Sequence, residues 1–141
     1  MTSIDDARDA GALLLPLIGR VVTRFCLDFA VNLEFLNAEP AYYVCIESDP
    51  LFSQEGNEVA LSLDDPGHVA QLSIVARKKL RDIRVSEHGT LILLFGERLK
   101  LSVPANAKYE AWNVSASDGM KIVCMPGGRL AIWSPNDPSA T

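Results

Sequence analysis

The most constraining feature of the sequence is an alternation of apolar and polar side chains over residues 21–35. Apolar or β-branched residues occupy the odd positions, and most even positions carry polar side chains such as Arg24 and Asn32. A period of two is typical of a β-strand with one buried face. Because single strands of about 15 residues are unusual, we expect a bend, bulge or tight turn near Asp28.

Similar patterns predict strands along much of the remaining chain. Their expected positions are residues 42–47, 59–63, 82–85, 90–95, 98–103, 111–115, 121–125 and 130–133, with a polar loop at 53–58. Residues 90–95 are apolar on both faces, which is typical of a strand in the interior of a sheet. The hairpin that follows has two registers: a two-residue loop sets Leu99 opposite Leu94, and a three-residue loop sets it opposite Phe95. Periodicity does not choose between them.

One helix start is clear. Asp65 can cap free backbone N–H groups, Pro66 suits the first helical position, and the basic residues 77–79 would complement the negative end of the dipole. The sequence therefore predicts a helix over about 66–79.

Together these elements predict an α+β fold in a single domain, residues 13–134, with a meandering, mainly antiparallel sheet and one covering helix. Residues 1–12 are expected to form a flexible or weakly helical arm, and residues 135–141 a loose tail. A chain of 141 residues is long enough to bury a core without disulfides or a metal ion.

Charge and cysteine content limit the partners and the compartment. The formal net charge of −5 argues against nucleic-acid binding, which needs a basic face, and is compatible with a basic protein partner. No segment approaches the ~20 apolar residues of a membrane span, and acidic residues precede the apolar stretch 12–18, unlike a signal peptide. The three cysteines, Cys26, Cys45 and Cys124, are expected to be buried reduced thiols, as in a cytoplasmic protein.

No catalytic, metal-binding or cofactor-binding motif is recognisable. His68 and His88 have no metal-ligand spacing, no nucleophile lies beside a base, and the cap explains the paired carboxylates at 64–65. We therefore predict no catalytic residue, metal ligand or cofactor.

The segment 109–133 contains both tryptophans and gives the candidate binding residues. These are Tyr109, Glu110, Trp112, Arg129 and Trp133, in which Glu110 and Arg129 could pair across adjacent strands. On one interpretation the tryptophans are core anchors and residues 126–128 form a tight turn; on the other, an aromatic face grips a partner. The glycines Gly127 and Gly128 suggest special backbone angles or a close approach that side chains would forbid.

This segment resembles an uncharacterised actinobacterial domain family. The likeness rests on Tyr-Glu-Ala-Trp at 109–112 and Pro-Gly-Gly-x-Leu-Ala-x-Trp at 126–133. Residues 17–22 look like the family's opening strand, and residues 89–91 with 99–104 look like its middle hairpin. The turn at 96–97 departs from the Asp-Gly that members often carry. The resemblance covers roughly 15–133 and implies one compact domain, without an activity or catalytic residues.

Three functions remain open. The leading hypothesis is a non-catalytic interaction module, for example an immunity or antitoxin-like protein that occludes a basic partner. The second is a small-molecule-binding domain with a pocket between sheet and helix lined by Tyr42, Tyr43, Trp112 or Trp133. The third is an enzyme with a scattered site around Glu110, Arg129 and His68. A homodimer formed through an exposed strand edge is compatible with all three.

Overall fold

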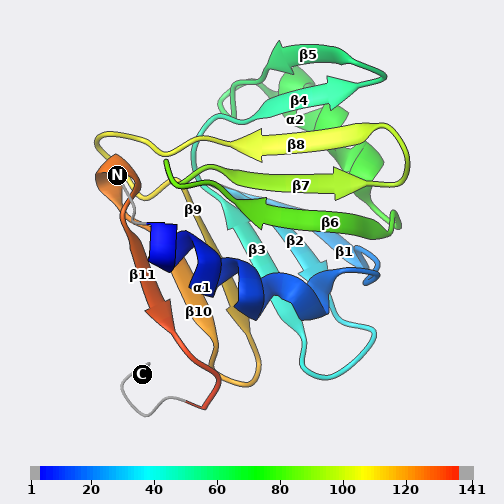
Figure 1. The fold of residues 1–141 in the computed structure, drawn as a ribbon. Helices are drawn as coiled ribbons and strands as arrows, with labels where there is room; N and C mark the ends of the chain where they lie inside the picture. The colour runs from blue at the N-terminus through cyan, green and yellow to red at the C-terminus, as the bar shows by residue number, and fades with distance from the viewer. Residues whose placement is uncertain (1–3, 137–141) are drawn as a thin grey trace.

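The computed structural model describes residues 4–136, which form two antiparallel sheets (Figure 1). One sheet contains β1 (Arg24–Leu27), β2 (Val31–Phe35), β3 (Tyr42–Ile46), β9 (Trp112–Ala116), β10 (Lys121–Cys124) and β11 (Leu130–Trp133), in the order β1-β2-β3-β9-β10-β11. The other contains β4 (Leu51–Gln54), β5 (Asn57–Ala60), β6 (Leu80–Val85), β7 (Leu91–Phe95) and β8 (Leu99–Val103), in the order β5-β4-β8-β7-β6. The α+β class and the antiparallel pairing are confirmed, but the described residues form two sheets rather than one.

Two α-helices accompany the sheets in the described range, α1 (Ile4–Leu14) and α2 (Pro66–Leu72). Short 3-10 turns cover Leu15–Leu17, Ser73–Val75 and Pro126–Gly128. In Figure 1 the strands of the two sheets cross, α1 lies beside β6 in front of the six-stranded sheet, and α2 lies behind β4 and β8. The five-stranded sheet and α1 therefore cover the inner face of the six-stranded sheet.

One hydrophobic core lies between these layers, and alternation decides which side chains enter it. In β2 the residues Val31, Leu33 and Phe35 are fully buried, while the residues between them are partly exposed. β3, β7 and β9 have the same pattern, which is the period of two expected for a strand with one covered face. Each large apolar side chain that is buried in this way contributes about 1.5–3 kcal/mol to folding.

The two hairpins that the sequence indicates most strongly both form. The alternating segment 21–35 divides at Asp28 into β1 and β2, and the Asp28 N–H donates to the Ala30 carbonyl oxygen (3.1 Å), so the expected turn is confirmed. In the hairpin of β7 and β8, Phe95 pairs with Leu99 across a three-residue loop. Because β7 is apolar on both faces, only the complete fold decides between the two registers.

The predicted helix over 66–79 is too long. Asp65 caps α2 as expected, accepting from the N–H groups of Gly67 (2.8 Å) and His68 (3.3 Å), but the helix ends at Leu72 and a 3-10 turn follows. The basic residues then pair with the chain before β1: the Arg77 N–H donates to the Val22 carbonyl oxygen at 2.8 Å. They therefore do not lie at the end of a helix, because their backbone is engaged in strand-like pairing.

The polar segment 53–58 is part of a hairpin rather than the loop that its composition predicts. It contains the ends of β4 and β5 around a turn at Glu55 and Gly56, which both have positive φ. All four residues of β5 are exposed. A strand at a sheet edge needs no buried face, so its polarity does not distinguish it from a loop.

The N-terminal arm, expected to be flexible or weakly helical over 1–12, contains most of α1. Ala10 and Leu14 of this helix are fully buried, and α1 lies against β6 and β11. Residues 1–3 and most of the predicted tail, 137–141, lie outside the described residues. No helix in the described range is long and apolar enough to cross a bilayer.

Candidate functional site

Trp112 lies at the junction of the two sheets rather than on the surface. Its side chain is fully buried, and its indole N–H donates to the carbonyl oxygen of Gly89 at 2.9 Å. Gly89 belongs to the turn between β6 and β7, in the other sheet. The buried Cys124 thiol donates to the same oxygen at 3.4 Å. Two side chains of the six-stranded sheet therefore hold one backbone carbonyl of the five-stranded sheet.

Gly89 and Gly128 bring the same two turns into direct backbone contact. Both residues have positive φ, +85° and +97°. A Cβ atom on Gly128 would lie 2.6 Å from the carbonyl oxygen of His88, and one on Gly89 would lie 2.6 Å from the carbonyl oxygen of Gly128. The close approach inferred from the glycine pair is thus confirmed at Gly128, whereas a Cβ atom on the neighbouring Gly127 would have no such neighbour within 4 Å.

These contacts assign the segment 109–133 its main structural role. Trp112, Cys124 and Gly128 join the ends of the two sheets, so this part of the segment is a folding element. Trp112 has no exposed surface and is removed from the candidate binding residues. Its apolar ring and polar N–H are both satisfied inside the protein, as buried tryptophans usually are.

The other candidate residues of this segment do not form one face. Tyr109, Glu110 and Arg129 are exposed; the first two lie in the loop before β9, and Arg129 lies just before β11. β9 and β11 lie on opposite sides of β10, so Glu110 and Arg129 do not face each other across adjacent strands, and no ion pair joins them in the described part of the chain. The expected cross-strand pair is therefore wrong, because the strand order separates its two members.

Trp133 lies on the outer face of the six-stranded sheet, the face directed away from the core. It pairs with Lys121, which pairs with Ser115, which pairs with Tyr43. Cross-strand partners project from the same face, so these four side chains form one row across β3, β9, β10 and β11. The row is named the Tyr43–Trp133 row below. Tyr43 is exposed and Trp133 is half-buried.

No helix in the described chain lies over this outer face. α1 packs on β6 and β11 in the layer of the five-stranded sheet, and α2 lies behind β4 and β8 (Figure 1). The row continues over β2 and β1 with Glu34 and Arg24, whose Oε1 and Nε atoms are 3.9 Å apart. The outer face therefore combines two aromatic side chains with hydroxyl, amine and ion-paired groups, all open to a partner.

Alternation alone could have placed Ser115 and Lys121 on an outer face, since they occupy the polar positions of predicted strands. It could not show that β3, β9, β10 and β11 are consecutive neighbours. For that reason the sequence does not reveal the row as a site.

Neither Cys45 nor Cys124 forms a nucleophilic site. Burial, with the nearby Glu47 carboxylate adding to the effect, raises the pKa of the Cys45 thiol to about 11. Burial also raises the pKa of the Cys124 thiol to about 11. Both thiols are therefore protonated near neutral pH and weakly nucleophilic.

The pocket expected between sheet and helix is not formed by the tyrosines and tryptophans. Tyr42 and Trp112 point into the core, whereas Tyr43 and Trp133 lie on the opposite face of the same sheet. Burial raises the pKa of the Tyr42 hydroxyl, with the Asp118 carboxylate adding to the effect and the Arg20 guanidinium opposing it. These residues cannot line one cavity.

The residues suggested for an enzyme site are also dispersed. His68 lies in α2, where its Nδ1 accepts from the Ser62 N–H at 2.9 Å. Arg129 precedes β11, and Figure 1 shows α2 and β11 on different sides of the fold. Among the described residues no group of histidine, cysteine and carboxylate side chains is arranged to hold a metal ion.

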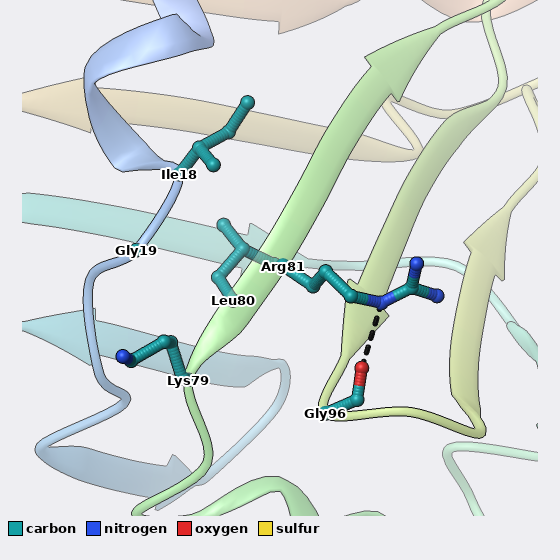
Figure 2. A pocket seen from close by; sticks show the side chains of 6 residues that line it. All are labelled: Ile18, Gly19, Lys79, Leu80, Arg81 and Gly96. Atoms are coloured by element: carbon teal, nitrogen blue, oxygen red, sulfur yellow. Dashed lines mark hydrogen bonds between the residues drawn. The ribbon is translucent and has the colours of Figure 1, made fainter.

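Figure 2 shows an apolar hollow where the chain before β1 meets β6 and the turn between β7 and β8. Its volume is about 260 Å³, and its lining residues are Ile18, Gly19, Lys79, Leu80, Arg81 and Gly96. Two of the polar groups there are already paired: Arg81 Nε donates to the Gly96 carbonyl oxygen (2.7 Å), and the Gly19 N–H donates to the Leu80 carbonyl oxygen (2.7 Å). The hollow is slightly below the ~300–1,000 Å³ of typical ligand pockets and offers a ligand few polar contacts.

The fold thus defines a small α+β domain of two antiparallel sheets with an uncovered outer face. A family model matches residues 13–134, and the chain belongs to this family, DUF6188, a family of unknown function. No curated protein and no solved structure matches the chain.

Proposed function

We propose that the protein is a non-catalytic protein-interaction module and that the Tyr43–Trp133 row is the centre of its contact surface. The observation that carries the proposal is the alignment of two aromatic side chains on the uncovered face of the six-stranded sheet. Tyrosine and tryptophan contribute more binding energy than most residues because they bury large rigid areas.

The geometry of the row suits a protein partner. Three strand intervals separate Tyr43 from Trp133, so their backbones lie about 14 Å apart at the ~4.8 Å spacing of a sheet. Ser115 and Lys121 between them provide hydrogen-bond donors. A pair of aromatic anchors with polar groups between them matches the mixed composition of non-obligate interfaces.

The charges near the row favour a partner with a neutral or mixed surface. Arg24 and Lys121 are positive on this face, where Arg24 lies beside the negative Glu34. The Glu47 and Asp28 carboxylates lie near Cys45 on the same face, so the charges there nearly balance and the face carries little of the acidic surplus of the chain. The acidic residues concentrate elsewhere, for example at Asp5 and Asp6 in the first turn of α1. We therefore prefer this partner chemistry to the basic partner that net charge alone suggests, and we keep the reducing cytoplasm as the compartment in which three free cysteines are expected.

The proposal is tested by site-specific photocross-linking in the native cell. A photoreactive phenylalanine analogue replaces Lys121, in the middle of the row, or in a matched control Lys100, on the five-stranded sheet. A protein that cross-links at position 121 but not at position 100 is then purified, and its affinity for the unlabelled chain is measured by calorimetry.

Two variants distinguish this row from the exposed loop before β9. The double substitution Tyr43→Ala with Trp133→Ala should weaken binding of the purified partner at least ~30-fold, as expected for two anchors worth about 2 kcal/mol or more together. The control Tyr109→Ala removes an exposed aromatic ring outside the row and should change the affinity less than about threefold. Equal cross-linking at both positions, or unchanged binding by the double variant, would refute the proposal.

A further inference from the structure

The two sheets expose unequal edges. α1 lies against the edge strands β6 and β11, and the segment 77–80 pairs with residues 20–22 just before β1. This leaves β1 itself and β5 as edge strands with no further strand beside them in the described fold. An uncovered edge presents unpaired backbone N–H and C=O groups that can bind another strand. Natural edges are usually protected by charge or distortion, so an apolar edge needs an explanation.

β1 carries large apolar side chains on its free edge, where charged residues usually protect a strand from pairing with another chain. Leu27 is 53% exposed, and Phe29, at the tip of the hairpin of β1 and β2, is fully exposed. Phe25, on the same side of the strand as Leu27, is half-buried. Exposed residues of this size on a free edge indicate a surface that is covered by a partner.

The direction of the backbone N–H and C=O groups alternates along β1 and shows which of them are not paired with β2. The Asp28 N–H donates to the Ala30 carbonyl oxygen (3.1 Å), and the ladder to β2 continues through Cys26 and Arg24. Residues of an antiparallel strand alternate between its two sides, so the even-numbered residues of β1 bond to β2. The N–H and C=O groups of Phe25 and Leu27 consequently point away from the sheet.

A second copy of β1 fits these free groups in one register. When Phe25 exchanges backbone bonds with Leu27 of a second copy, and Leu27 with its Phe25, all four free groups are satisfied about a two-fold axis at Cys26. The same register sets Arg24 opposite Asp28 of the second copy, twice, on the outer face of the sheet. Opposite charges that face each other in an antiparallel pair are stabilising.

Neighbouring registers lose this match. Moving the second copy by two residues sets Phe25 opposite Phe25 or Leu27 opposite Leu27, so one pair of free groups has no partner within the strand and Arg24 no longer meets Asp28. The other free edge, β5, contains Glu58 as its only charged residue and has no opposite charge to pair with it. Of these two edges, only β1 is therefore complementary to a second copy of itself.

We propose that two copies of this chain associate through β1 in antiparallel orientation, with Cys26 at the two-fold axis, and join their six-stranded sheets into one continuous sheet. The contact is short, so a weak, concentration-dependent dimer is expected. The pairing also joins the outer faces of the two copies and would present two Tyr43–Trp133 rows on one surface. It depends only on the edge geometry and holds whether or not the row binds a protein.

Charge-swapped variants test the register by sedimentation velocity from about 10 µM to about 500 µM. Arg24→Glu sets a carboxylate opposite Asp28 of the second copy, and Asp28→Lys sets an ammonium group opposite its Arg24. Each variant alone should therefore raise the dimer dissociation constant at least ~10-fold, because like charges directly opposite each other repel. In a one-to-one mixture of the two single variants, both facing pairs of the mixed dimer join a carboxylate to a cation, so the mixture should dimerise more tightly than either variant alone. The double variant Arg24→Glu with Asp28→Lys tests the same pairing within one chain.

The double variant restores opposite charges at both facing positions of its own dimer. It should dimerise within about threefold of the unmodified chain, whereas each single variant stays weak. Mixed with the unmodified chain, the double variant should form no mixed dimer, because every facing pair would then bring like charges together. Local effects, such as loss of the Arg24–Glu34 contact, weaken the double variant at least as much as Arg24→Glu and cannot produce this recovery.

A cross-link provides a second, independent readout. The Cα atoms of the two Cys26 residues would be about 4.5 Å apart, within the range of a disulfide. Diamide should therefore oxidise the two thiols to a disulfide, itself being reduced to the hydrazine, and yield a covalent dimer of the unmodified chain and of the control Cys45→Ser. Cys26→Ser should yield none. A chain that stays monomeric at the highest concentration, a double variant as weak as the single variants, or a covalent dimer that persists in Cys26→Ser would overturn the proposal.

Discussion

Replacing Gly128 by alanine should destabilise the protein more than replacing its neighbour Gly127. The new Cβ atom would lie 2.6 Å from the His88 carbonyl oxygen, a backbone atom that cannot rotate away. The positive φ of +97° adds its own cost, about 1–2 kcal/mol for a residue with a side chain. Relief of the overlap costs about 1–3 kcal/mol more, as for other overpacked sites. We therefore expect a total loss of about 2–5 kcal/mol in the free energy of unfolding.

Gly127→Ala is the matched control. Gly127 lies in the same turn and has a similar φ of +86°, but nothing lies within 4 Å of the position of its Cβ atom. Its substitution should cost only the conformational term, about 1–2 kcal/mol. The difference between the two variants then isolates the close approach of the turns at Gly89 and Gly128.

The assay is equilibrium unfolding in urea at neutral pH, followed by tryptophan fluorescence and checked for reversibility. Both variants should keep the slope of the transition and shift its midpoint, by more for Gly128→Ala. Equal midpoints for the two variants would show that the turns do not touch as described. A loss at Gly128 that is smaller than the loss at Gly127 would refute the reasoning outright.

Three further predictions concern other parts of the fold. Trp112→Phe removes the indole donor from the buried Gly89 carbonyl and should lower the free energy of unfolding in urea by about 1–3 kcal/mol. The remaining Trp133 of that variant should be quenched readily by acrylamide, whereas the remaining Trp112 of Trp133→Phe should be quenched poorly. The reverse order would be incompatible with the burial of the two residues. Burial raises the pKa of Cys124 from 9.0 to about 11, so its contribution to stability is complete below pH 9 and is lost as the pH rises toward 11. From about pH 8 to about pH 10 the unmodified chain should lose about 1 kcal/mol more than Cys124→Ala in urea unfolding, and identical slopes would contradict this. Asp65→Ala removes the acceptor for two backbone N–H groups at the start of α2 and should lower the free energy of unfolding by about 0.5–2 kcal/mol, measured by thermal unfolding. An unchanged unfolding temperature would show that the cap does not stabilise the folded state.

Local structure can be predicted from the sequence where one face of an element is buried. The alternation over 21–35, the turn at Asp28 and the cap at Asp65 are all confirmed, because each depends on residues close together in the chain. The close approach at Gly128 is also anticipated by the glycine pair, since glycine is required where a side chain would collide.

The candidate site can be predicted only in part. The hypothesis of a binding face includes both tryptophans, but Trp112 is buried and Trp133 lies on the outer face. An alternating strand has two faces, and both tryptophans occupy positions that alternation allows on either one. Which face is inner depends on the other layer of the fold, which a single strand does not specify.

By itself, the sequence determined the fold class, the positions of most strands and the expectation of special backbone angles or a close approach at Gly127 and Gly128. The tertiary structure alone decided that the strands divide into two sheets, that β10 separates β9 from β11, and that Tyr43 and Trp133 share one uncovered face. The physical reason is that periodicity and turn chemistry act over a few residues, whereas neighbours across a sheet are chosen by contacts between segments far apart in the chain. A binding surface built from such neighbours exists only once the sheet has formed.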